Sequence, residues 1–366
     1  MDFTAFLKAS DDELESLIQE PAPAPRGRKP DYYLNLAFDP ADRIFENGIF
    51  ALAQFLTILG PGGIGKSRLL LQLAIFTIIG RNFLAFRVSK RKLRWLIIQT
   101  ENSNWRIQED LARFRAALTE EEWALVQENL IILSLEHKYG GFAGLSDMES
   151  KLMLAKAIKE ANADVVAFDP LFAFSSGNLN GDEGMIRSCQ TIDELAHIAN
   201  PNTAVVVLHH TLTGMAGIRK AFGHERGSYG RGSKALNSWT RGQINLVPGD
   251  PEDKMKLVIT CGKNSNGPEF QPFGVKLNPS TMIYEVDEGF DIDRWKAEIM
   301  GKPTPKGKPT PEAIVDLLQD IALSRKDLTE LIMDNFGCGK STAYAAIAMA
   351  DGVTLRRNSA RKYERA

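Results

Sequence analysis

Short apolar runs alternate with longer stretches of helical periodicity from about residue 33 to residue 299. The apolar runs predict buried strands of a parallel sheet, and the stretches between them predict helices that cover the sheet. The predicted strands are Phe55–Leu59, Leu93–Gln99, Leu130–Leu133, Val165–Asp169, Ala204–His209, Gly242–Val247 and Lys256–Cys261, followed by a closing hairpin from Val275–Leu277 and Met282–Val286. The pattern therefore predicts an α/β domain with a mostly parallel central sheet over residues 31–299.

Both ends of the chain depart from this alternation. Residues 1–20 contain six acidic residues and one Lys, and a proline-rich stretch follows up to residue 30. Together they predict a short amphipathic helix on an extended linker over residues 1–30. A second linker rich in Pro, Gly and Lys covers residues 300–309 and separates residues 310–366 from the α/β domain.

Residues 310–366 predict three short helices and a basic hairpin. Thr310 and Pro311 have the residue types of a helix N-cap and first helical position, and Ser324 can cap the second helix. This order of elements is that of a winged helix-turn-helix, for which a protein-interaction module is the alternative. In the winged-helix interpretation, the residues that contact duplex DNA are Lys340, Arg356, Arg357, Arg361 and Lys362.

Composition and charge limit the possible classes. The chain has 366 residues, a formal net charge of −2 and 44% hydrophobic residues, so any nucleic-acid surface must be local. Its three cysteines are far apart and lack C-x-x-C spacing, which argues against disulfides or a zinc site. The acidic N-terminus and the lack of a long uncharged apolar run predict a cytoplasmic protein without membrane contact.

The sequence Gly60-Pro-Gly-Gly-Ile-Gly-Lys-Ser67 lies between a predicted strand and a predicted helix. It fills every fixed position of the G-x-x-x-x-G-K-[ST] phosphate-binding loop, whose glycines let backbone N–H groups surround a phosphate at a helix N-terminus. The Lys reaches the β- and γ-phosphates, and the Ser hydroxyl ligates Mg²⁺. The predicted nucleotide-binding residues are Gly60, Gly62, Gly63, Gly65, Lys66, Ser67 and Arg68; an incidental glycine-rich turn is the alternative.

Two carboxylates follow predicted strands. Glu101 ends the strand at Leu93–Gln99, where it can orient the water that attacks the γ-phosphate; a solvated, capping glutamate is the alternative. Asp169 ends the apolar strand Val165–Asp169, the pattern of a Walker-B residue that holds Mg²⁺. An Asp-Pro turn is the alternative for Asp169, but the preceding apolar strand favours the magnesium role.

Two histidines and a basic segment come next. His209 and His210 end another apolar strand, where they can contact the γ-phosphate; a turn hydrogen bond without a role is the alternative. Residues 217–242 contain six basic residues and one acidic residue, among them the predicted DNA contacts Arg226 and Arg231. Such a segment is typical of a loop that contacts nucleic acid, and equally of a solvated flexible loop.

Taken together, these motifs resemble the RecA-like core of DnaB-type hexameric helicases, and most closely the plasmid RepA family, over roughly residues 45–290. The resemblance rests on Thr-Glu-Asn (100–102), Phe-Asp-Pro-Leu (168–171), Leu-His-His-Thr (208–211), Arg-Gly-Ser-x-Ala-Leu (231–236) with Arg241, and Lys263-x-x-Asn-Gly-Pro (263–268). It departs from DnaB-like chains after the last core strand, where an Arg is usual near the Lys and this chain has Asn264 and Ser265.

The resemblance implies a role for each strand-end residue. Glu101 is the catalytic carboxylate, Asp169 organises Mg²⁺, and His210 with its neighbour His209 senses the γ-phosphate. Arg241 is an arginine finger for the next subunit's ATP, and Lys263 joins it. We therefore expect an ATP- and Mg²⁺-dependent DNA motor that forms a hexameric ring on single-stranded DNA. Its C-terminal unit can add contacts to duplex DNA.

Two alternatives to a helicase share these motifs. One is a recombinase-like ATPase without unwinding activity, and the other is a DNA-binding regulator whose assembly ATP controls.

Overall fold

The computed structural model describes residues 27–135, 144–175, 179, 181–211, 218–230, 234–300, 309–318, 322–336, 338–360 and 362–365. The predicted acidic helix and most of its linker, residues 301–308 of the second linker, and the predicted DNA contacts Arg231 and Arg361 lie outside these ranges. The chain divides into two compact units, Met1–Ile292 and Asp293–Ala366, and each is described by itself.

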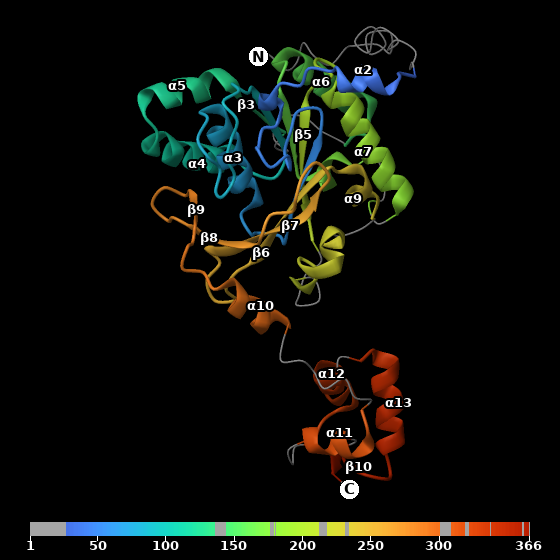
Figure 1. The fold of residues 1–366 in the computed structure, drawn as a ribbon. Coiled ribbons are helices and arrows are strands. Elements are labelled where there is room, and N and C mark those ends of the chain that lie inside the picture. Colours follow the sequence, from blue (N-terminus) through green and yellow to red (C-terminus); the bar gives the residue numbers. More distant parts are fainter. Residues whose placement is uncertain are drawn as a thin grey trace. The chain divides into compact units, whose positions relative to one another are not determined.

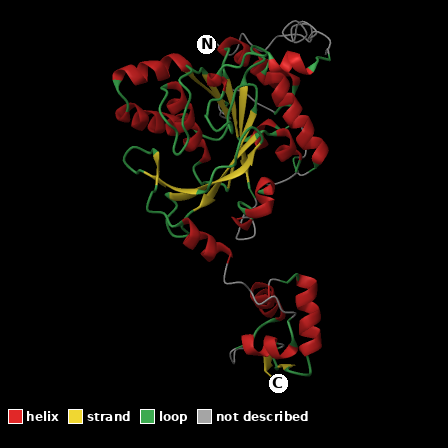
Figure 2. Cartoon of the chain, in the orientation of Figure 1, coloured by secondary structure: helices red, strands yellow, loops and turns green. Residues whose placement is uncertain are grey.

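The first unit is built on a nine-stranded sheet of order β3-β2-β4-β5-β1-β6-β7-β8-β9 (Figures 1 and 2). Strands β1 to β6 run parallel, whereas β7, β8 and β9 are antiparallel to their neighbours. The strands are β1 (Phe55–Gly60), β2 (Trp95–Gln99), β3 (Leu130–Ser134), β4 (Val165–Asp169), β5 (Ala204–His210), β6 (Gly242–Pro248), β7 (Lys256–Asn264), β8 (Phe273–Leu277) and β9 (Tyr284–Val286). The predicted α/β fold with a mostly parallel sheet and a closing hairpin is confirmed.

Helices cover both faces of this sheet, with α3, α4 and α5 on one side and α6, α7 and α9 on the other (Figure 1). The helices and short 3-10 turns are α2 (Pro30–Leu34), η2 (Pro40–Asp42), α3 (Lys66–Ile78), α4 (Asn104–Ala117), α5 (Glu120–Asn129), α6 (Met148–Ala161), η4 (Leu171–Phe174), α7 (Asp182–Ala196), η5 (Gly223–Ser228), α9 (Ala235–Trp239) and α10 (Ile292–Met300). Helix caps match the sequence: the Thr119 side chain forms a capping box at α5, and Ser103 and Asp147 cap α4 and α6.

The central strands are buried on both faces, which explains why they read as continuous apolar runs rather than alternating ones. All five residues of β2 and of β4 are buried, as are the first six of β5. Helix α3 is likewise buried from Leu69 to Ile78, so it packs as a core helix directly behind the phosphate loop.

Strand register defines two functional edges of the sheet. Gly60 of β1 is level with His210 of β5, and Gln99 of β2 is level with Asp169 of β4, so four strands end together at the carboxyl edge. At the opposite, amino edge, Leu56 is level with Gly242, the first residue of β6. Ligands of open α/β sheets bind at the carboxyl edge, where the strand order reverses direction.

The second unit contains helices α11 (Pro311–Leu317), α12 (Arg325–Phe336) and α13 (Lys340–Ala350) and a hairpin of β10 (Leu355–Arg357) and β11 (Tyr363–Arg365). Thr310 accepts a hydrogen bond from the Ala313 N–H, and Ser324 accepts one from the Asp327 N–H, as the predicted caps require. A small core around Ile314, Leu328 and Ile347 holds the unit together. Among the described residues, no helix combines the length and apolar character needed to cross a bilayer.

Candidate nucleotide site

The phosphate loop follows β1 and leads directly into α3. Gly63 and Gly65 have φ angles of +73° and +94°, in the left-handed region that side chains rarely adopt, so the loop needs glycine at both positions. A side chain at Gly60 would be tightly packed, because a Cβ would lie 3.0 Å from Ile64 and 3.1 Å from Leu246. This geometry leaves the first N–H groups of α3 directed at the space where a phosphate chain binds.

Lys66 lies folded back onto the loop that carries it. Its ammonium group donates hydrogen bonds to the carbonyl oxygens of Gly60 (2.9 Å) and Pro61 (2.8 Å), and it lies 3.3 Å from Nδ1 of His210. Burial lowers the pKa of Lys66 to about 8, and the nearby carboxylates of Asp169 and Glu101 oppose this shift. Lys66 is therefore a poorly solvated cation beside two carboxylates, poised to gain an anion.

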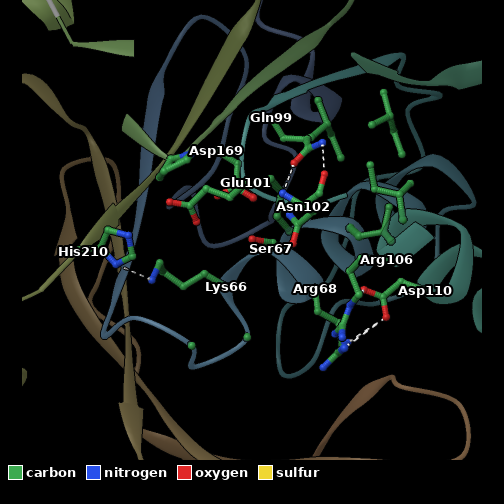
Figure 3. Close-up of a pocket in the computed structure, with 18 residues that line it drawn as sticks. Lys66, Ser67, Arg68, Gln99, Glu101, Asn102, Arg106, Asp110, Asp169 and His210 are labelled. Atoms are coloured by element: carbon green, nitrogen blue, oxygen red, sulfur yellow. Dashed lines mark hydrogen bonds and ion pairs between the residues drawn. The ribbon is translucent and has the colours of Figure 1, made fainter. Parts of the chain in front are cut away.

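A cavity of about 270 Å³ opens in front of the loop (Figure 3). It brings together nearly all residues that the sequence assigned to nucleotide and magnesium. The lining includes Gly63, Gly65, Lys66, Ser67, Arg68, Glu101, Asp169 and His210. Gly60 and Gly62 belong to the same loop, and Gly62 lies close to the His210 ring.

Glu101 is presented by a braced turn. Gln99, at the end of β2, donates from its amide to the Asn102 carbonyl oxygen (2.9 Å) and to Ser134 (2.6 Å), and it accepts from the Asn102 N–H (2.7 Å). Glu101 sits inside this closed turn and is itself exposed to the cavity (Figure 3). A fixed backbone with a free carboxylate is suited to orienting a water molecule.

Asp169 is buried at the end of β4, with 3% of its surface exposed. Burial raises its pKa to about 6, while a hydrogen bond with the Ser67 side chain acts in the opposite direction. Mg²⁺ in phosphate-transfer sites is held by one or two protein groups, with phosphates and water supplying the other ligands. The contacting pair of Ser67 hydroxyl and Asp169 carboxylate fits that donor set, and no larger cluster of His, Cys, Asp and Glu occurs among the described residues.

The two histidines of β5 point to opposite sides, as alternation along a strand requires. His210 faces the phosphate loop beside Lys66, whereas His209 is buried at 5% exposure and lies near Gly230. The structure therefore gives them different surroundings, and only His210 lines the nucleotide cavity.

An ionic cluster of Arg68, Arg106 and Asp110 forms a wall that the sequence did not reveal. Asp110 accepts hydrogen bonds from Arg68 (3.2 Å) and from Arg106 (3.0 Å), and all three line the cavity. Only Arg68 was predicted, as the residue next to the loop. The only sequence feature that links Arg106 and Asp110 is their spacing of four positions on a helix. Oppositely charged pairs at this spacing are common on solvent-exposed helix faces, so the spacing does not indicate a binding site.

The phosphate loop also rests on strand β9, far along the chain. The fully buried Gln72 side chain forms two 2.8 Å hydrogen bonds with the backbone of Tyr284, and the Tyr284 hydroxyl lies 3.4 Å from the Ile64 carbonyl oxygen. Tyr284 leaves no room for a Cβ at Gly65. No local sequence pattern indicates this contact, which joins residues 212 positions apart.

Arg241 and Lys263 lie at the other edge of the sheet. Arg241 directly precedes β6, and its N–H donates to the Phe55 carbonyl oxygen (2.9 Å) at the start of β1. The sequence placed Lys263 in a turn beyond its strand, which is wrong: β7 continues to Asn264 and pairs Lys263 with Gln243. A bulge at Gln243–Ile244 explains the longer strand, since it lets pairing continue past the apolar run.

These two cations have no carboxylate partner among the described residues. Arg241 is exposed, and Lys263 donates to the Asn237 carbonyl oxygen (2.7 Å). Burial lowers the pKa of Lys263, and the neighbouring positive charge of Arg241 lowers it further. The five steps of β1 separate this edge from the phosphate loop by about 16 Å, so Arg241 does not reach its own chain's nucleotide.

The predicted DNA contacts have varied surroundings. Arg226 forms an ion pair with Glu269. In the C-terminal hairpin, Arg356 pairs with Glu364 at 3.0 Å and Arg357 with Asp351 at 2.8 Å. Lys340 starts α13 and lies over the Tyr344 ring, and Lys362 is exposed.

The loop, the buried Asp169 beside Ser67 and the braced Glu101 define a P-loop ATPase. A family model described as an AAA domain matches residues 31–213, half of the chain, and the chain belongs to this family. No curated protein matches it. Among solved structures it is similar to one titled "ATPase Domain of G40P", with 14% identity, a TM-score of 0.46, and coverage of 64% of this chain and 85% of that one.

Proposed function

We propose that this chain is an ATP-driven DNA motor, a replicative helicase of RepA type that hydrolyses ATP between the subunits of a ring. The observation that carries the proposal is the separation of Lys66 and Arg241 to opposite edges of one sheet. A head-to-tail assembly brings the amino edge of one subunit against the carboxyl edge of the next, and such heterologous contacts form a ring when the rotation between subunits closes.

Within this assembly each residue has a defined task. Lys66 and the loop N–H groups bind the β- and γ-phosphates, while Ser67 and Asp169 would hold Mg²⁺. Magnesium, when bound, neutralises charge on the phosphates. Glu101 orients the attacking water and accepts its proton, and His210 lies where it contacts the γ-phosphate.

Arg241 of the next subunit, with Lys263 beside it, stabilises the charge that develops on the transferred phosphoryl group. Two adjacent cations that have no carboxylate partner within the described ranges, on a rigid base, suit a site that an anion from outside the chain completes. His210, which senses the γ-phosphate, and Arg241, which stabilises the transition state, then lie on different subunits.

DNA contact is assigned to the basic loop before Arg231, which follows the histidine strand. In the proposed ring this segment faces the central channel and follows single-stranded DNA by its phosphates. Duplex DNA is assigned to the C-terminal unit. Since Arg356 and Arg357 are already paired within that unit, Lys340 and Lys362 carry more of this interaction.

The direct test is a mixing experiment. Lys66→Ala and Arg241→Ala proteins are each expected to hydrolyse ATP poorly, with or without single-stranded DNA. When the two are mixed and reassembled, some interfaces combine an intact loop from one variant with an intact Arg241 from the other. Recovered, DNA-stimulated hydrolysis supports the ring motor, whereas no recovery, or full activity of Arg241→Ala alone, rules out the shared site.

A DNA-binding regulator with the same ATPase core is the second candidate, favoured by the separate C-terminal unit. It predicts tight binding of a specific duplex by the full chain and turnover that ignores single-stranded DNA. A strand-displacement assay on a forked substrate separates the two, since only the motor unwinds it.

A further inference from the structure

Three polar side chains lie fully buried on the two strands that carry Arg241 and Lys263. Gln243 and Asn245 of β6 and Thr260 of β7 have exposures of 1%, 0% and 1%. We refer to these three residues as the buried polar cluster. Polar groups are costly to bury unless each finds a hydrogen-bond partner, so their partners indicate what the cluster holds.

Among the described residues, the side-chain hydrogen bonds that leave the cluster go to one segment, residues 218–230. Thr260 donates to the Ala221 carbonyl oxygen (2.6 Å), and Gln243 and Asn245 each donate to the Arg226 carbonyl oxygen at 3.1 Å. Gln243 also donates to the Asn245 side chain (2.9 Å), which fixes the orientation of both amides. The segment is therefore attached through its backbone, whatever its side chains bind.

The same segment touches the strand that ends at the nucleotide. Thr211, which follows His210, forms a β-bridge with Gly230. Gly230 also packs against Leu59 and His209, which lie at the ends of β1 and β5. One end of the segment thus lies against the two strands that carry the phosphate loop and its histidine sensor.

Other contacts of segment 218–230 lie toward the amino edge of the sheet. Gly227 packs so closely on Asn237 of α9 that a Cβ has no room there. The Asn237 carbonyl oxygen accepts the hydrogen bond from Lys263, and α9 ends two residues before Arg241. Segment 218–230 therefore links the nucleotide edge, through Gly230, to the backbone that holds Lys263, through Asn237.

We propose that Gln243, Asn245 and Thr260 are positioning residues that couple occupancy of the chain's own nucleotide pocket to the placement of Arg241 and Lys263. This inference rests on the proposed function, in which those two residues act on the next subunit's ATP. A nucleotide that engages His210 shifts the strand tip and the bridged Gly230. The cluster transmits the shift to β6 and β7 because its hydrogen bonds hold only one register of the segment.

Thr260→Val tests the coupling with little change in shape, because it replaces one hydroxyl with a methyl group. The matched control is Thr57→Val, the same change at a residue with 0% exposure whose hydroxyl has no hydrogen-bond partner among the described residues. Thr260→Ser keeps the hydroxyl and serves as the conservative rescue. Circular dichroism first checks that all three variants fold.

The primary measurement is amide hydrogen exchange of residues 234–241 with and without Mg²⁺ and a non-hydrolysable ATP analogue. The full-length protein, Thr57→Val and Thr260→Ser should show a nucleotide-dependent change there. Thr260→Val should bind the analogue normally but lose the change. Its DNA-stimulated kcat should fall about tenfold with KM unchanged, the scale expected when the Ala221 carbonyl oxygen loses its short hydrogen bond and keeps only the 3.4 Å one from Asn245.

Two results overturn the coupling: a wild-type protein without the nucleotide-dependent change, or a Thr260→Val protein that responds as Thr57→Val does. Wild-type turnover that ignores single-stranded DNA instead overturns the proposed motor. Because the exchange experiment contains no DNA, the two failures are distinguished.

Discussion

The two edges of the parallel sheet differ in whether their positively charged side chains have carboxylate neighbours. At the carboxyl edge, Lys66 faces Asp169 and Glu101, and Asp110 is shared between Arg68 and Arg106. At the amino edge, Arg241 and Lys263 lie together with no described carboxylate to neutralise them. In the proposed ring, the carboxyl edge supplies a nearly complete pocket, and the amino edge supplies the cations that complete the pocket of the next subunit.

The strongest test of this contrast is Arg241→Ala. If the amino edge completes another subunit's site, turnover falls by about 10³-fold or more, the usual contribution of an arginine finger. Affinity for ATP should change little, because Arg241 lies away from its own chain's pocket. Arg94→Ala is the matched control: Arg94 is also exposed and also directly precedes a parallel strand at this edge. Equal effects of the two substitutions would contradict the assignment.

At the carboxyl edge, Glu101→Gln should lower kcat by about 10²- to 10³-fold, the scale of losing a positioned general base. Nucleotide should still bind, since the loop and Lys66 are intact. Single-turnover hydrolysis with saturating ATP measures the loss. Glu109→Gln, on the following helix but outside the cavity lining, should retain full activity.

Whether a charged side chain is neutralised by a partner can be tested by measuring the free energy of unfolding after that side chain or its partner is removed. Asp110→Ala leaves Arg68 without its partner, and the Arg68 side chain is only 10% exposed. The free energy of unfolding should fall by about 2–3 kcal/mol. Arg241→Ala should change it by less than about 0.5 kcal/mol, because no described partner is lost. Urea titration of both variants gives the comparison, and a large loss for Arg241→Ala would show that its charge is compensated after all.

The smallest predicted effect is a pH dependence of nucleotide affinity. Asp169, whose pKa is raised to about 6, must be ionised to hold Mg²⁺, so affinity should fall about tenfold per unit below that pH. Lys66, whose pKa is lowered to about 8, must stay charged, so affinity should also fall above that pH. Calorimetry from about pH 5 to about pH 9 measures the profile.

Glu101→Gln sharpens this profile, because the Glu101 carboxylate raises both pKa values. Both limbs should therefore move to lower pH in the variant. Limbs that stay in place would mean that Asp169 and Lys66 do not set the profile.

Much of this architecture could be predicted because the residues of the nucleotide site lie at the carboxyl ends of parallel strands. Every predicted strand is present, and Lys66, Ser67, Glu101, Asp169 and His210 meet in one cavity. Parallel strands bring residues that are distant in sequence to one edge, so finding the strands was enough to group their terminal residues. The tasks assigned to individual residues remain proposals.

The parts of the structure that the sequence did not predict depend on contacts between residues far apart in the chain, and such contacts produce no local sequence pattern. The sequence placed Arg226 on a DNA-binding loop, but its ion pair with Glu269 joins residues 43 positions apart. The two hydrogen bonds between Gln72 and Tyr284 and the partners of Asn245 are equally non-local. A polar residue within an apolar run shows only that it needs a partner, and tertiary structure decides which one.

The folded-back Lys66 has a consequence for the end of the reaction cycle. When spent nucleotide departs, the ammonium group does not face an empty cavity, because the Gly60 and Pro61 carbonyl oxygens replace the lost phosphate oxygens at 2.9 and 2.8 Å. An internal substitute ligand lowers the cost of the vacated state, at the expense of some affinity for incoming ATP. We therefore expect ADP and ATP both to bind this pocket less tightly than they would if Lys66 had no partner within its own loop.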